Sequence, residues 1–162
     1  IVDPGKLLDR TREIVIERLA KSGEEVKDGM DISLCALNIK TKQLQWSGAN
    51  NPVWIHRKEA QEIEETKANK QPIGLYHEPK PFTTHEIALN EGDSVYVLTD
   101  GYQDQFGGPK GKKFKAKQLK DLLVANQNLS MSALSDVLTQ RFEEWKGDVE
   151  QIDDVCVIGV RI

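Results

Sequence analysis

The sequence lacks the features that mark several special classes of protein. It contains no uninterrupted apolar stretch near the roughly 20 residues that a helix needs to cross a bilayer. Basic residues are not in excess, since 22 lysines and arginines stand against 26 aspartates and glutamates, and the net charge is −4. This balance argues against nucleic acid as the main partner. The calcium-loop pattern Asp-x-Asp-x-Asp-Gly is also missing.

Cysteine is scarce as well. Only Cys35 and Cys156 occur, and each lies within an apolar, strand-like run. Nothing in the sequence supports a disulfide between them. We expect buried, reduced thiols in a cytoplasmic protein.

The length and composition fit one soluble domain. The chain has 162 residues, of which 38% are hydrophobic and 30% charged. It starts on Ile1 rather than on Met, and it stops on Ile162 within a strand pattern. We therefore expect residues 1–162 to be a single domain that is a piece of a longer protein, at least on its N-terminal side.

Hydrophobic periodicity predicts an α+β fold with helices packed on antiparallel sheets. Apolar residues at helical spacing predict a helix over 5–21, which Asp3 and Pro4 would begin. Two apolar segments around a short turn predict a hairpin over 31–48. The remaining predicted elements are strands 53–57, 82–89 and 94–99, a helix within 113–126, a helix capped by Ser130 or Ser132, and a strand within 152–162.

Two acidic sites lie at the ends of predicted strands. Asp100 directly follows the apolar run SVYVLT, and Asp153 and Asp154 directly precede VCVIGV. If the two strands are antiparallel neighbours, Asp100 and Asp153 converge at one edge of the sheet. Converging carboxylates need a cation or a raised pKa, and Mg²⁺ or Mn²⁺ suits such oxygen ligands. Gly101 would let the backbone approach that cation. By itself, Asp-Gly after a strand is more often just a turn, and Asp-Asp before a strand is often a solvated edge or a cap.

Five segments in order add a family resemblance to these residues: DGMDISLCALN, WSGANNPVW, QPIGLY, VLTDGYQDQFGG and QIDDVCVIGV. Together they resemble the catalytic domain of bacterial metal-dependent serine/threonine protein phosphatases of the PPM, or type 2C, family. The branch typified by stage II sporulation protein E is the most similar, and the resemblance covers essentially the whole chain.

The resemblance implies two packed antiparallel sheets with helices outside and a two-metal centre of Mn²⁺ or Mg²⁺. It assigns Asp100, with Gly101, and Asp153 to the metal site, Asp104 to an additional, weaker metal, and Asp154 to a supporting position beside the ligands. The implied reaction is hydrolysis of phosphoserine or phosphothreonine on a signalling phosphoprotein. An upstream sensor domain is expected, and this sensor is the part that could tether the otherwise cytoplasmic protein to a membrane.

One part of the family pattern is missing. The family's bridging ligands lie in an acidic segment followed by Gly-His-Gly, whereas none of His56, His77 and His85 is flanked by glycine. We therefore expect the chain to be the C-terminal two-thirds of the domain, to hold half of the metal site and to be inactive alone. Sheet edges left open by the missing segment would make the chain self-associate as a homodimer, unless helix 5–21 covers the gap.

Other candidate residues have simpler explanations. A run of lysines could guide a phosphoprotein or bind polyanions, although a solvated surface is the simpler interpretation: Lys110, Lys112, Lys113, Lys115, Lys117 and Lys120. Asn50 and Asn51 could line a phosphate site, and Asp28 and Asp31 could be ligands, but turn formation explains both pairs.

Two further functions remain open beside the phosphatase. The first is a non-catalytic, phosphatase-like signalling or interaction module. The second is an acidic binder of divalent cations with unrelated chemistry. The residues preceding Ile1 in the gene would distinguish an enzyme from a non-catalytic relic.

Overall fold

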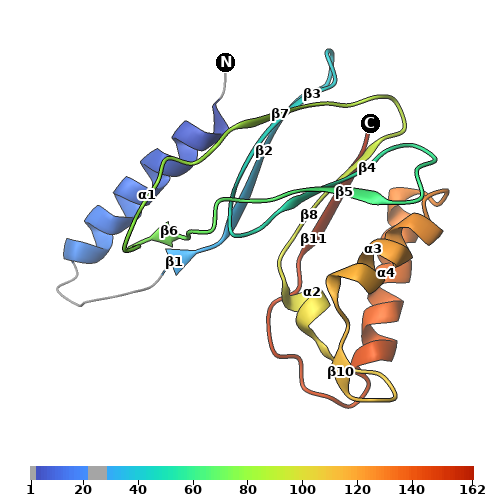
Figure 1. Cartoon of the computed structure of the whole chain (residues 1–162). Helices are drawn as coiled ribbons and strands as arrows, with labels where there is room; N and C mark the ends of the chain where they lie inside the picture. Colours follow the sequence, from blue (N-terminus) through green and yellow to red (C-terminus); the bar gives the residue numbers. More distant parts are fainter. Residues whose placement is uncertain (1–2, 22–28) are drawn as a thin grey trace. The chain divides into compact units, whose positions relative to one another are not determined.

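A computed structural model describes residues 3–21 and 29–162 (Figure 1). Two compact units make up this part of the chain. The first unit contains the described residues up to Val53, together with Glu65–Asn90 and Ile162. The second contains Trp54–Glu64 and Glu91–Arg161. Each unit is an α+β structure with its own core.

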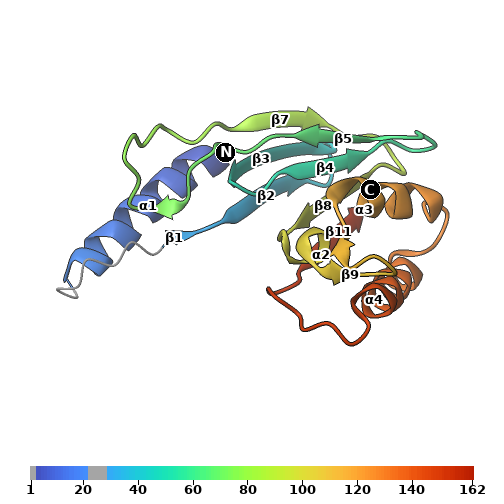
Figure 2. The ribbon, with the colours of Figure 1, turned by 60° about the horizontal axis from the view of Figure 1, so that its bottom comes forward.

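The first unit combines one long helix with a three-stranded antiparallel sheet. The sheet has the order β2-β3-β7, and Figure 2 shows α1 running alongside β6. Leu8 of α1 packs with Ala49, Ile73 and Phe82 to form the core of this unit. The elements are α1 (Pro4–Lys21), β1 (Gly29–Met30), β2 (Ile32–Asn38), β3 (Gln43–Ala49), β6 (Ile73–Gly74) and β7 (His85–Ala88). The predicted helix and the predicted hairpin are confirmed.

Asp3 begins α1 as the sequence predicts. Its carboxylate accepts hydrogen bonds from the Lys6 backbone N–H (3.2 Å) and the Thr84 hydroxyl, and its carbonyl accepts from the Leu7 N–H (3.1 Å). Pro4 fits the first helical position because that residue needs no N–H donor. The hydrogen bond from the Thr84 hydroxyl, and after it the one from the Lys6 backbone, holds the pKa of Asp3 below its ordinary value of 3.8.

Most residues of a four-stranded sheet of order β11-β8-β4-β5 belong to the second unit. β11 pairs with β8 in antiparallel register. The strands are β4 (Val53–His56), β5 (Ile63–Thr66), β8 (Ser94–Leu98) and β11 (Val157–Arg161). The chain between β8 and β11 forms α2 (Gly101–Asp104), β9 (Phe106–Gly107), β10 (Lys112–Lys113), α3 (Ala116–Ala125) and α4 (Met131–Lys146).

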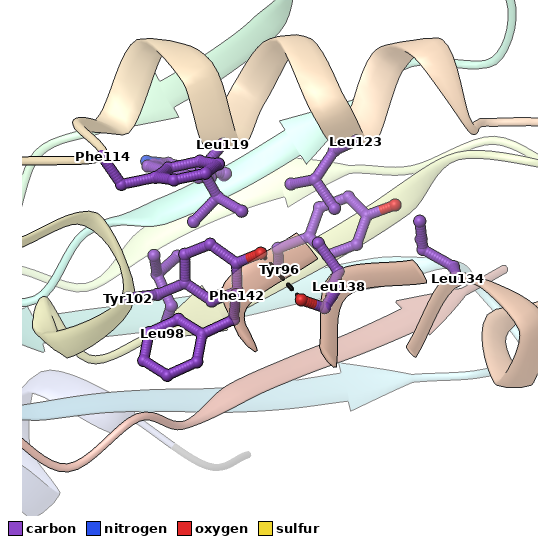
Figure 3. Close-up of a cluster of buried hydrophobic side chains, with 10 residues drawn as sticks. Tyr96, Leu98, Tyr102, Phe114, Leu119, Leu123, Leu134, Leu138 and Phe142 are labelled. Carbon is purple, nitrogen blue, oxygen red and sulfur yellow. Dashed lines mark hydrogen bonds between the residues drawn. The ribbon is translucent and has the colours of Figure 1, made fainter. Parts of the chain in front are cut away.

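The core of the second unit lies between this sheet and its helices (Figure 3). The helix expected after Ser130 or Ser132 is α4, and its residues Leu134, Leu138 and Phe142 form a buried apolar stripe. They meet residues from β8, α2, α3 and the connection that precedes α3: Tyr96, Leu98, Tyr102, Phe114, Leu119 and Leu123. Burying one such large apolar side chain contributes about 1.5–3 kcal/mol relative to leaving it exposed. This core fixes the end of β8, where Asp100 follows.

The predicted burial of the thiols is wrong. Cys35 and Cys156 are both free and exposed. β2 is an outer strand of its sheet, so Cys35 has a neighbouring strand on one side only. Cys156 lies just before β11, which is also an outer strand.

Candidate functional site

The two predicted acidic sites lie at the same end of the β8–β11 pair. Leu98 is opposite Val157 and Ser94 is opposite Arg161. The residues that follow β8 therefore lie beside the residues that precede β11. This arrangement confirms the predicted antiparallel neighbours, although β11 begins at Val157, later than the sequence suggested.

Thr99 links the two segments beyond the end of the strands. Its backbone N–H donates to the carbonyl of Cys156 (3.0 Å). Its hydroxyl Oγ1 accepts from the Cys156 N–H (3.0 Å) and donates to the carbonyl of Asp154 (2.9 Å). Sequence reasoning missed this role. The only available signal was a hydroxyl residue between an apolar run and Asp100.

Gly101 lies against the backbone of the second acidic segment. A Cβ atom built on Gly101 would be 2.4 Å from the carbonyl oxygen of Asp154, which is too close for any side chain. The sequence suggested a glycine for close approach to a cation. The structure supplies a local reason, since only glycine lets Asp100 and its helix α2 pack beside residues 153–155.

The two main carboxylates are open to solvent. Asp100 occupies the N-cap position of α2 without accepting a capping hydrogen bond from that helix. Asp153 is exposed, and its Oδ1 accepts a local hydrogen bond from the Asp154 N–H (2.7 Å). Both residues offer hard oxygen atoms at one edge of the unit, which suits Mg²⁺ or Mn²⁺.

Asp104 and Asp154 have different surroundings. Asp104 forms an ion pair with Lys113, with 2.8 Å between Oδ2 and Nζ. A metal at Asp104 would have to compete with this lysine. Asp154 contributes its backbone carbonyl to Thr99, and its own side chain is exposed.

The described residues fit part of a metal site rather than a whole one. Among residues 3–21 and 29–162, no three His, Cys, Asp or Glu side chains are grouped so that they could hold a metal ion. Asp100 and Asp153 therefore do not form a complete metal site with other described side chains.

The other candidates lie elsewhere. Asn50 and Asp31 are in the first unit, where the Asn50 side-chain amide donates to Asp31 Oδ1 (2.8 Å). Asn50 has a positive φ of 59°, which fits the turn that the sequence indicated. His56 is buried, with Nε2 2.8 Å from the Ala60 carbonyl, and His85 lies against the Trp46 ring. Asp28 lies outside the described residues.

No described helix is both long enough and apolar enough to span a membrane.

Comparison with known proteins links this geometry to a family. The family model described as "Stage II sporulation protein E (SpoIIE)" matches residues 2–162. Among curated proteins, no match was found.

Solved structures share the fold. The SiaA-PP2C domain of Pseudomonas aeruginosa superposes with a TM-score of 0.87 at 24% identity, over 99% of this chain and 61% of that one. The phosphatase domain of the cell fate determinant SpoIIE from Bacillus subtilis superposes with a TM-score of 0.63 at 16% identity. The match covers 97% of this chain and 72% of that one. The RsbU and RsbW domains of a Mycobacterium tuberculosis protein superpose with a TM-score of 0.64 at 16% identity. The match covers 96% of this chain and 46% of that one.

These likenesses confirm the α+β fold with antiparallel sheets and helices that the sequence predicted. The chain spans about three-fifths of the SiaA domain that it matches.

Proposed function

The chain belongs to the family of stage II sporulation protein E, and from that membership we propose that its domain is a metal-dependent phosphatase for phosphoserine or phosphothreonine on a signalling protein. The observation that carries the proposal is the junction of Thr99–Gly101 with Asp153–Cys156, which brings two exposed acidic positions to one edge.

Asp100 and Asp153 would hold Mn²⁺ or Mg²⁺, with Asp104 at a further, weaker position. When bound, such ions offset the negative charge of the phosphoryl group and make a water molecule acidic enough to act as the nucleophile. The chain's own residues set the geometry. Thr99 holds the Asp154 and Cys156 backbones beside Asp100. Gly101 has no side chain, so the chain at this position can lie against the backbone of Asp154 without a steric clash.

The test uses the full-length product of the gene and a phosphoserine peptide. Asp100→Asn and Asp153→Asn should each reduce Mn²⁺-dependent turnover to background, with the fold retained in circular dichroism. Asp136→Asn is the matched control, because Asp136 is an exposed aspartate on α4. Full turnover in both site variants would refute the assignment.

We expect the 162-residue chain by itself to bind Mn²⁺ weakly and to turn over little substrate. The reason is that its described residues contain no group of three metal-binding side chains. Isothermal titration calorimetry measures this directly. Tight binding of two ions per chain would contradict it.

A non-catalytic signalling module is the second candidate, and the same incomplete ligand group favours it. It predicts that the full-length product binds the phosphopeptide without hydrolysing it at any Mn²⁺ concentration. In either case we propose a bacterial signalling protein of the cytoplasm whose upstream sensor domain receives the signal.

A further inference from the structure

Positive charge is concentrated in one segment of an otherwise acidic chain. The net charge is −4, yet six lysines occur between Lys110 and Lys120, and no acidic residue lies between Asp104 and Asp121. Neither the fold nor the proposed metal site requires this concentration of charge.

The structure gathers part of the segment around a hollow in the second unit. The hollow has a volume of about 270 Å³ and a mostly apolar lining. We call it the lysine hollow, and the residues that line it are Pro109, Lys110, Lys112, Lys113, Lys115, Gln118 and Trp145. Apolar lysine stems can cover such a surface while their ammonium groups remain in water.

Backbone contacts hold the hollow in shape. The Gly108 N–H donates to the Trp145 carbonyl (2.8 Å), and Trp145 Nε1 donates to the Gln105 carbonyl (3.1 Å). A Cβ atom on Gly108 would be 2.6 Å from the Trp145 ring, and Gly108 has a φ of +65°. Glycine is therefore needed for the turn to approach the indole.

One lysine adopts a backbone conformation that is rare for its type. Lys115 has a φ of +74°, a region that side chains other than glycine rarely adopt and that persists only where surrounding contacts hold it. Its N–H donates to the Gln103 carbonyl (2.7 Å), and the neighbouring Phe114 N–H donates to the Gln105 carbonyl (3.0 Å). These bonds fix the Lys115 backbone at the border of the hollow.

Only part of this positive charge is used in ion pairs within the described residues. Lys113 pairs with Asp104. Lys110, Lys112 and Lys115 are exposed, and they form no ion pair with any residue that the structure describes. Unpaired ammonium groups around an apolar surface attract an anionic group that carries an apolar neighbour.

We propose that the lysine hollow docks an acidic, phosphorylated segment of the protein substrate, and this inference rests on the proposed phosphatase function. Two observations favour a protein segment over nucleic acid: the chain is acidic overall, and the hollow is apolar inside. The ion pair between Lys113 and Asp104 connects the hollow to α2, the helix that directly follows Asp100.

The experiment measures fluorescence anisotropy of a labelled acidic phosphopeptide with the full-length gene product, without metal. Lys110, Lys112 and Lys115 are changed together to Gln. The control changes Lys40, Lys67 and Lys70 to Gln, three exposed lysines of the first unit. Both triples alter the net charge equally. The first should weaken binding about tenfold, as three surface charge contacts of about 0.5 kcal/mol each would. The control should leave it within about twofold.

Three outcomes would overturn the docking site. They are equal weakening in both triples, no measurable peptide binding, and tighter binding of duplex DNA than of the phosphopeptide. In turnover assays, the Lys110/Lys112/Lys115 triple should raise KM for the phosphopeptide and leave hydrolysis of a small aryl phosphate unchanged.

The results that would refute the phosphatase activity differ from those that would refute the docking site. Asp100→Asn should leave metal-free peptide binding intact while turnover is lost. Peptide binding at the hollow with no turnover in the unaltered protein would refute the phosphatase activity. Turnover with no such binding would refute only the docking site.

Discussion

A single hydroxyl group holds together the two acidic segments of the candidate site. Thr99 Oγ1 accepts from the Cys156 N–H and donates to the Asp154 carbonyl. Valine has nearly the same shape but can do neither. Thr99→Val should therefore lower the free energy of unfolding by about 1–2 kcal/mol, the value of two ordinary hydrogen bonds.

If Asp100 and Asp153 hold Mn²⁺ as proposed, the same change should weaken Mn²⁺ binding, because Thr99 no longer bonds the Asp154 and Cys156 backbones beside Asp100. Urea unfolding and calorimetry measure the two effects. Thr139→Val is the control, since Thr139 bonds only to a carbonyl of its own helix. An unchanged Mn²⁺ affinity in Thr99→Val would show that this hydroxyl does not position the site.

Burial of Tyr102 gives a prediction at alkaline pH. Its hydroxyl donates to the Leu138 carbonyl (2.8 Å) inside the core. Burial raises the pKa of Tyr102 from 10 to about 12, against a smaller opposing effect of Arg141. Because the folded pKa is the higher one, the neutral phenol stabilises the fold fully below pH 10. That contribution is lost as the pH rises through about 12.

Tyr102→Phe tests both the contribution of the Tyr102 hydrogen bond and the predicted loss of stability at alkaline pH. The change should cost about 1 kcal/mol at neutral pH through the lost hydrogen bond. It should also flatten the fall in stability between the unfolded and folded pKa of Tyr102. Urea unfolding at a series of pH values measures this. A variant that loses stability with pH as steeply as the unaltered protein would contradict the assignment to Tyr102.

At the scale of elements, the start of α4 distinguishes two serines. Ser130 is the N-cap, and its Oγ accepts from the Ala133 N–H (3.2 Å). Ser132 is exposed inside the first turn. Ser130→Ala should cost about 1 kcal/mol of stability. Ser132→Ala should be neutral or slightly stabilising, since alanine is the better helix former. Equal effects in chemical denaturation would show that the cap contributes nothing.

Elements with a long apolar pattern could be predicted from the sequence, whereas short ones could not. The α4 stripe and the β8 run each hold enough apolar residues to define their periodicity. β1 and β6 have two residues each and exist because they pair with each other across 43 positions. The four-residue helix α2 was missed for the same reason, since no pattern fits into so few residues.

The candidate site was also predictable only in part, namely where it depends on long apolar strands. That the segments carrying Asp100 and Asp153 lie at the same end of the β8–β11 pair followed from antiparallel pairing of two recognisable strands. The hydroxyl bonds of Thr99 and the close packing of Gly101 depend on the register of that pairing. The order of polar and apolar residues along the sequence does not specify which residue of one strand lies opposite which residue of the other. The metal-ligand roles came from the family resemblance and stay predictions.

At the scale of the whole molecule, β11 is the outer strand at one end of its four-stranded sheet. Within the part that the structure describes, β11 pairs only with β8. Ile158 and Val160 lie on the same face of the strand, and they are 55% and 44% exposed. In the first unit, α1 buries Leu8 against Ala49, Ile73 and Phe82.

This edge is complementary to a second copy of itself. If two β11 strands pair antiparallel about Gly159, Ile158 lies opposite Val160 of the partner subunit, and the four apolar side chains form one patch. No like charges face each other in this register, because Arg161 lies opposite the partner's Val157. Unpaired strand edges with exposed apolar residues recruit further strands. We therefore predict that the 162-residue chain forms a dimer through β11.

Light scattering over a range of concentrations tests the dimer. The mass should rise from monomer toward dimer as the concentration increases. Val160→Lys should abolish the rise, because two lysines would enter the shared patch and lose solvation there. Lys is also a residue with which natural sheet edges prevent such pairing. Ala88→Lys is the control, since Ala88 is an exposed position on β7, an outer strand of the three-stranded sheet. A constant monomer mass at high concentration rules out the dimer, and a dimer that survives Val160→Lys must use another surface.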